Sequence, residues 1–164
     1  MRLRRFLLKA IICAGVAVPI AAMGDEERSS EGLENAENPW AASQLIQPEE
    51  LVRRLSVAAG SRPTVLYIGP SILFRSGHIP SARYVGPAAQ APALEELQRQ
   101  LRTLTKGSEI VLYCGCCPWE HCPNIRPAFN LIVNMGFTKA SLLHLPRSFK
   151  EDWTDRGFPV RQDE

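Results

Sequence analysis

The sequence predicts an α/β domain with a mainly parallel central sheet, because strand patterns and helix patterns alternate along its central part. Residues 64–68 and 110–113 are unbroken apolar, β-branched runs, which are typical of strands buried on both faces. Between them, residues 93–104 place four leucines on one helical face: Leu94, Leu97, Leu101 and Leu104. Sheets of this kind bind their ligands outside the carboxyl ends of the strands.

The remaining elements continue this alternation. They are, in order, a helix over 48–55, a strand over 82–85, a helix over 125–135, a strand over 140–145 and a last helical turn over 149–153. The first helix begins at Pro48, a residue that suits the first turn. Asn124 can cap the helix that follows it, Pro127 falls in that helix's first turn, and Gly136 can end it.

The first 24 residues predict a secretory signal peptide. A basic segment is followed by an uncharged stretch over 10–23, and small residues at Ala21, Ala22 and Gly24 precede acidic ones. We therefore expect an exported protein, periplasmic or secreted, that loses Cys13 with the signal and has no stable membrane insertion afterwards. The alternative is an uncleaved N-terminal anchor, although a membrane span needs about 20 apolar residues.

Residues 25–39 predict an acidic flexible linker, and residues 40–162 predict one compact domain. Removal of the signal changes the formal net charge from +2 to −2, because it removes four basic residues and no acidic one. The mature protein then lacks the basic character that would indicate nucleic acid as a partner. We expect a monomer.

Four cysteines lie within nine residues, directly after the strand over 110–113. The loop is Cys114-Gly115-Cys116-Cys117-Pro118-Trp119-Glu120-His121-Cys122. Backbone N–H groups of such a loop and of the following helix can stabilise an anionic sulfur. The cysteines are too close together to form a disulfide framework between distant segments, so sulfur chemistry or metal binding fits their spacing better.

Several segments resemble rhodanese-like domains, in the order that this family has them. Gly77-His78-Ile79-Pro80-Ser81-Ala82 resembles the family's Gly-His-Ile-Pro-Gly-Ala segment. Val111-Leu112-Tyr113-Cys114 is similar to the strand that carries its catalytic cysteine, and Gly157-Phe158-Pro159-Val160 to its C-terminal Gly-Tyr-Pro-Val. The chain is identified as a divergent member, which implies a three-layer fold with helices on both faces of the sheet.

The resemblance implies a sulfurtransferase that works through a cysteine persulfide and needs no cofactor. Cys114 would be the nucleophile, and Arg126 would hold an anionic donor. The donor would be a small sulfane-sulfur compound such as thiosulfate, and the acceptor a thiol, including a protein thiol, or cyanide. A nucleophilic thiolate needs a lowered pKa, which backbone amides and a nearby cation provide.

The chain departs from the family pattern at three places near this loop. Arg126 comes twelve residues after Cys114, about twice the usual spacing, so the loop is extended. Tyr67-Ile68-Gly69 replaces the Asp-x-Arg of the second strand, and Arg147-Ser148 replaces a double glycine before the last helix. Because of these departures, the sequence leaves open whether the sulfur donor is thiosulfate.

Two other functions fit the same loop. Cys114 and Cys117 form a Cys-x-x-Cys pair that suits a thiol–disulfide redox protein. Cys116, Cys117, His121 and Cys122 offer ligands for a soft metal such as zinc or copper. In the sulfurtransferase interpretation, Cys117 or Cys122 resolves an oxidised Cys114, and Cys117 is slightly preferred for its spacing. Trp119 either covers the sulfur pocket, meets a partner or folds back on the domain.

Overall fold

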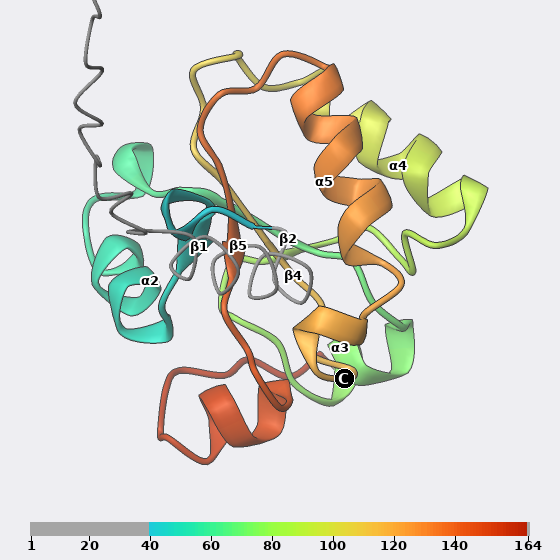
Figure 1. Cartoon of the computed structure of the whole chain (residues 1–164). Coiled ribbons are helices and arrows are strands. Elements are labelled where there is room, and N and C mark those ends of the chain that lie inside the picture. Colours follow the sequence, from blue (N-terminus) through green and yellow to red (C-terminus); the bar gives the residue numbers. More distant parts are fainter. Residues whose placement is uncertain (1–39, 164) are drawn as a thin grey trace, which may run out of the picture.

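The computed structural model describes residues 40–163 of the chain (Figure 1). The predicted signal peptide (1–24) and acidic linker (25–39) lie outside the described residues. Among the helices of residues 40–163, none has both the length and the apolar character that a membrane span requires.

A five-stranded parallel sheet forms the centre of the domain. In spatial order its strands are β1 (Leu45–Ile46), β5 (Ala140–Leu143), β4 (Ile110–Tyr113), β2 (Thr64–Tyr67) and β3 (Arg83–Tyr84). All four pairings are parallel. β4 lies in the middle, so its carboxyl end is surrounded by other strand ends and loops.

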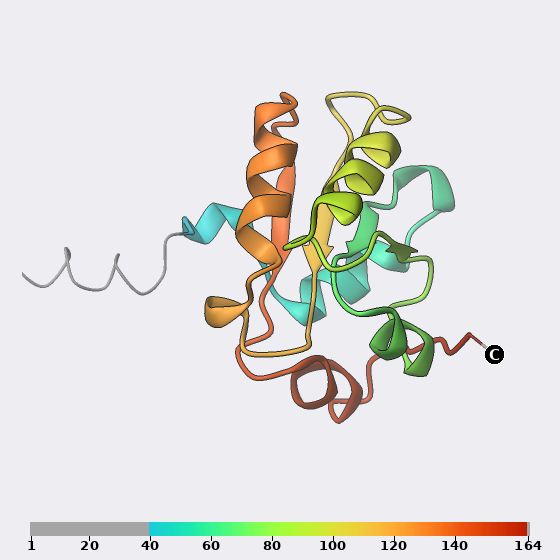
Figure 2. The same cartoon turned by 90° about the vertical axis from the view of Figure 1, so that its right-hand side faces the viewer.

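Helices cover both faces of the sheet, as the predicted three-layer fold requires (Figures 1 and 2). α4 (Ala91–Leu101) and α5 (Ile125–Asn134) pack on one face and α2 (Pro48–Leu55) on the other. The short α3 (Ser71–Ser76) lies beyond the strand ends, and its Phe74 joins the core on the α2 side. Successive side chains of a strand point to opposite faces. Ile110 and Leu112 of β4 accordingly join the core under α4 and α5, and Val111 and Tyr113 join the second core.

Most predicted elements are confirmed, with shifted bounds at some ends. α4 begins at Ala91 and ends at Leu101, so it starts and stops earlier than the predicted 93–104. The predicted turn over 149–153 is a single π-helical turn, η4 (Lys150–Thr154). α3 was not predicted, because two of its apolar side chains, Ile72 and Leu73, face solvent and leave no amphipathic pattern.

Candidate active site

Cys114 directly follows β4 and continues the alternation of that strand. Its side chain therefore lies on the α4 and α5 side, as those of Ile110 and Leu112 do. Only 2% of its surface is exposed. Its Sγ lies 3.2 Å from Sγ of Cys116 and 3.5 Å from Nδ2 of Asn124, which donates to it. The strand thus holds the predicted nucleophile rigidly at the carboxyl edge of the sheet.

Gly115 turns the chain away from the sheet in a conformation that favours glycine. Its φ is +74°, in the left-handed region. A Cβ there would lie 2.5 Å from Cβ of Phe149, and the Phe149 N–H donates to the Gly115 carbonyl over 3.1 Å. Gly115 therefore allows the cysteine loop to pack against the start of the last helical turn.

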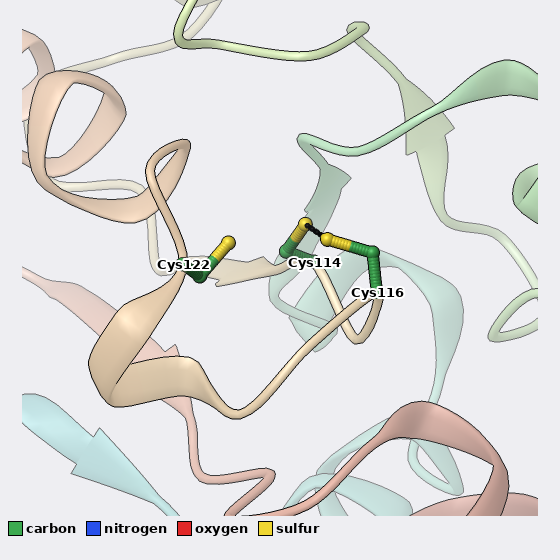
Figure 3. A group of neighbouring side chains, drawn as sticks. All are labelled: Cys114, Cys116 and Cys122. Atoms are coloured by element: carbon green, nitrogen blue, oxygen red, sulfur yellow. Dashed lines mark hydrogen bonds between the residues drawn. The ribbon is translucent and has the colours of Figure 1, made fainter.

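The loop brings sulfur atoms from its two ends together. The Sγ atoms of Cys114, Cys116 and Cys122 all lie within 4.8 Å of one another, and their side chains converge on one small space (Figure 3). Cys117 is adjacent, with its Sγ 3.4 Å from that of Cys116. The four cysteines of residues 40–163 are all free thiols.

This arrangement differs from the sets predicted for the two alternative functions. The three clustered sulfur atoms could hold a soft metal ion, but this set includes Cys114, and within the described residues it leaves out Cys117 and His121. His121 is exposed at the end of the 3₁₀ turn η3 (Trp119–His121). The thiol beside Cys114 is that of Cys116, whereas the Cys-x-x-Cys interpretation paired Cys114 with Cys117.

The extended part of the loop folds back into the core. Trp119 is 4% exposed and packs with the residues under α5, in an edge-to-face contact with the His144 ring at 5.3 Å between centroids. Of the three roles considered for Trp119, the structure shows the third. Trp119 therefore anchors the extended loop to the core.

Asn124 supports Cys114 and does not cap α5. In the described structure its side chain makes no capping hydrogen bond. Its Oδ1 accepts from the Ala89 N–H over 2.9 Å, and its Nδ2 points at Cys114. The predicted side-chain cap was therefore wrong, and sequence reasoning missed a residue of the site. Its place after Cys122 and Pro123 was the only available signal.

The clustered thiols shift one another's pKa values in opposite directions. A hydrogen bond from the Cys114 thiol, with smaller contributions from the Asn124 N–H and the other thiols, lowers the pKa of Cys122 to about 6 despite its burial. The same interaction with Cys122, together with burial, raises the pKa of Cys114. Burial and the Cys116 thiol raise the pKa of Cys117 to about 12. Of the Cys114 and Cys122 thiols, Cys122 is the one whose thiolate form is favoured, and Cys114 is the one that tends to keep its proton.

A cleft of about 380 Å³ opens beside Cys114 and Cys116. Its lining residues come from α3, the cysteine loop, η4 and the C-terminal segment. In Figure 2 the ribbons of α3 and η4 lie beyond the carboxyl ends of the strands. Cys122 does not line the cleft in the described structure. A molecule in the cleft would therefore meet Cys114 with Cys122 behind it.

Arg126 lies elsewhere. It is exposed in the first turn of α5 and, within residues 40–163, is not part of the cleft wall. Tyr67 borders the cleft, and its hydroxyl donates to the Pro70 carbonyl over 3.3 Å. Burial, with the charge of Cys114 second, raises the pKa of this tyrosine.

The turn at Arg147-Ser148 is fixed by the buried carboxylate of Asp152. This carboxylate accepts from the backbone N–H groups of Arg147 and Ser148 over 2.6 and 3.1 Å, and from the Arg147 guanidinium over 2.8 Å. Burial alone would raise the pKa of Asp152, but these hydrogen bonds lower it overall. The ion pair thereby positions Phe149, which packs against Gly115.

The comparisons with known proteins identify the fold. No family model and no curated protein matches the sequence. A rhodanese-related protein from Thermoplasma volcanium has a similar structure, with a TM-score of 0.52, 15% identity and coverage of 73% of this chain and 99% of that one. The rhodanese-like domain of the Alr3790 protein from Anabaena sp. gives a TM-score of 0.51 at 20% identity, over 73% and 80% of the two chains.

A third similar structure is that of a variant of EanB in complex with hercynine. Its TM-score is 0.53 at 21% identity, over 73% of this chain and 27% of the EanB chain. The domain is therefore a three-layer α/β domain with a cysteine loop at the carboxyl edge of its sheet. Its fold is the rhodanese-like fold, as the sequence motifs predicted.

Proposed function

We propose that this protein is a sulfurtransferase-type enzyme that carries sulfur as a persulfide on Cys114. The observation that supports this most is the position of Cys114, which borders the cleft and has the sulfur atoms of Cys116 and Cys122 within 4.8 Å of its own. It follows the central strand of a rhodanese-like fold, at the edge where parallel sheets bind their ligands.

In this mechanism Cys122 supplies the base and Cys114 the nucleophile. The Cys122 thiolate takes the proton of the Cys114 thiol as the Cys114 sulfur attacks the outer sulfur of a donor. A bond forms between these two sulfur atoms, the sulfur–sulfur bond of the donor breaks, and its remaining part leaves with the electron pair. Asn124 donates a hydrogen bond that favours the anionic form of Cys114 during the attack. A thiol or cyanide acceptor then attacks the outer sulfur and restores Cys114.

The same pair can close the site when no acceptor arrives. The Cys122 thiolate attacks the Cys114 sulfur of the persulfide, a disulfide forms between the two residues, and hydrosulfide leaves. Cys122 is the better resolving residue than Cys117, because its sulfur belongs to the same cluster as that of Cys114. The disulfide protects Cys114 from irreversible oxidation, and a reductant reopens it.

Peptide mapping by mass spectrometry tests this proposal. We expect that incubation with a sulfane-sulfur donor adds one sulfur atom to the Cys114 peptide, and that Cys114→Ser abolishes the gain. Cys117→Ser is the matched control, because its thiol is also in the loop but does not contact Cys114, and it should keep the gain. If the sulfur were found on Cys122 in the Cys114→Ser variant at the wild-type rate, Cys114 would not be the nucleophile.

A further inference from the structure

The cleft beside Cys114 indicates which class of donor it takes, an inference that depends on the proposed sulfurtransferase function. We propose that the donor is an organic sulfane-sulfur compound with an apolar body and at most one negative charge. This differs from the inorganic dianion thiosulfate. Two independent features of the described residues support the proposal: the apolar wall of the cleft and its charge balance.

The cleft is large and its wall is mostly apolar. Its volume of about 380 Å³ falls in the range of organic-ligand pockets, about 300–1,000 Å³. Leu73 and Val160 border it although they are 41% and 36% exposed, and Phe149 and Tyr67 add aromatic surface. A small inorganic anion would leave this apolar surface wet, whereas an apolar group would cover it.

The cleft offers no unpaired cation among the residues that line it in the described structure. Its one charged lining residue is Lys150, whose Nζ lies 2.7 and 2.8 Å from the two carboxylate oxygens of Asp155. The charge of this lysine is therefore already balanced. A dianion would lose its hydration at the cleft without gaining a matching positive charge.

Transfer of sulfur from such a donor to Cys114 needs no additional oxidant or reductant. With toluenethiosulfonate, the Cys114 sulfur attacks the terminal sulfur after its proton has passed to Cys122. The bond between that sulfur and the sulfonyl sulfur breaks, and toluenesulfinate leaves with the electron pair. Cys114 becomes a persulfide, and cyanide then removes the outer sulfur as thiocyanate.

The test compares toluenethiosulfonate with thiosulfate as donors to the protein, with cyanide as acceptor and thiocyanate as the measured product. Leu73→Ser removes part of the apolar wall. We expect it to lower kcat/KM for toluenethiosulfonate about tenfold, in the range of lost apolar pocket contacts, and to lower that for thiosulfate much less. Ile72→Ser is the matched control, because Ile72 is also an exposed apolar residue of α3, at 65%, but does not border the cleft.

The intrinsic reactivity of each donor is the same with every protein variant. A change in kcat/KM between variants therefore reports how the cleft recognises the donor. Equal losses with both donors in Leu73→Ser, or a wild-type kcat/KM for thiosulfate as high as that for toluenethiosulfonate, would overturn the inference and leave the sulfurtransferase function standing. Failure of both donors to form a persulfide on Cys114 would instead overturn the function, and the inference with it.

Discussion

In the proposed mechanism, the Cys114 and Cys122 thiols divide the two tasks of a nucleophilic site between them. Cys114 faces the cleft, and Cys122 lies behind it with a pKa lowered to about 6. Many nucleophilic cysteines depend on a histidine for the base. In this loop, His121 is exposed and is not part of the clustered group within the described residues. In the proposed mechanism, the Cys122 sulfur takes the place of the imidazole as the base.

This division predicts the pH dependence of persulfide formation on Cys114. Below about pH 6 both thiols are protonated and the pair carries no charge, so the rate should fall; above it the Cys122 thiolate is present and the rate should level off. In Cys122→Ser the base is lost and burial still raises the pKa of Cys114, so the rise should move to higher pH. Single-turnover rates across the pH range measure this.

Cys117→Ser serves as the control for the loss of a loop thiol and should keep the wild-type profile. A Cys122→Ser profile that coincides with that of the wild-type protein would show that Cys122 is not the base. Asn124→Ala, which removes the hydrogen bond to Cys114 and not the base, should lower the plateau without moving the midpoint.

At the scale of the elements, the packing of the cysteine loop against η4 depends on Gly115. Gly115→Ala should destabilise the protein by about 2–4 kcal/mol, because it combines a left-handed backbone with a collision against Phe149. Gly136→Ala is a matched control: its φ is +84°, but a Cβ there meets no atom within 4 Å, so only about 1–2 kcal/mol is expected.

Denaturant unfolding of the two variants separates the backbone cost from the steric cost. Because the collision lies between the loop and the turn that borders the cleft, Gly115→Ala should also reduce persulfide formation, whereas Gly136→Ala should not. Equal losses of unfolding free energy in the two variants would mean that the loop does not pack on η4 as described.

Helices and strands could be predicted from the sequence where the pattern of apolar residues reflects which side chains are buried. β2 and β4 are buried on both faces, so their apolar runs identified them, and with β4 the position of Cys114. Asn124 shows the limit of such reasoning. An asparagine before a helix normally caps it, but here a contact with Ala89, 35 residues earlier, takes its side chain.

Arg126 shows a second limit, since its expected role came from the spacing of shorter loops. The extra residues form η3 and insert Trp119 into the core, which leaves Arg126 exposed on α5. The convergence of Cys122 on Cys114 likewise depends on how this loop folds back, which no local pattern encodes.

For the whole molecule, we propose that the protein is exported and works as a domain released from its signal. The mature protein should begin near Asp25, carry a net charge of about −2 and be recovered from the periplasm or medium as a monomer. N-terminal mass spectrometry of the fractionated protein tests this. Recovery from the membrane fraction with residues 1–24 intact would favour the uncleaved anchor instead.

The inserted Trp119 has a consequence for moving this chemistry to another protein. The cysteine loop cannot be transferred to another protein by itself, because the indole of Trp119 occupies a space under α5 and contacts the ring of His144. A recipient scaffold without that space would have to expel the tryptophan, and the turn that returns Cys122 to Cys114 would then lose its anchor. A transfer would therefore have to include the loop and also the residues under α5 that surround Trp119.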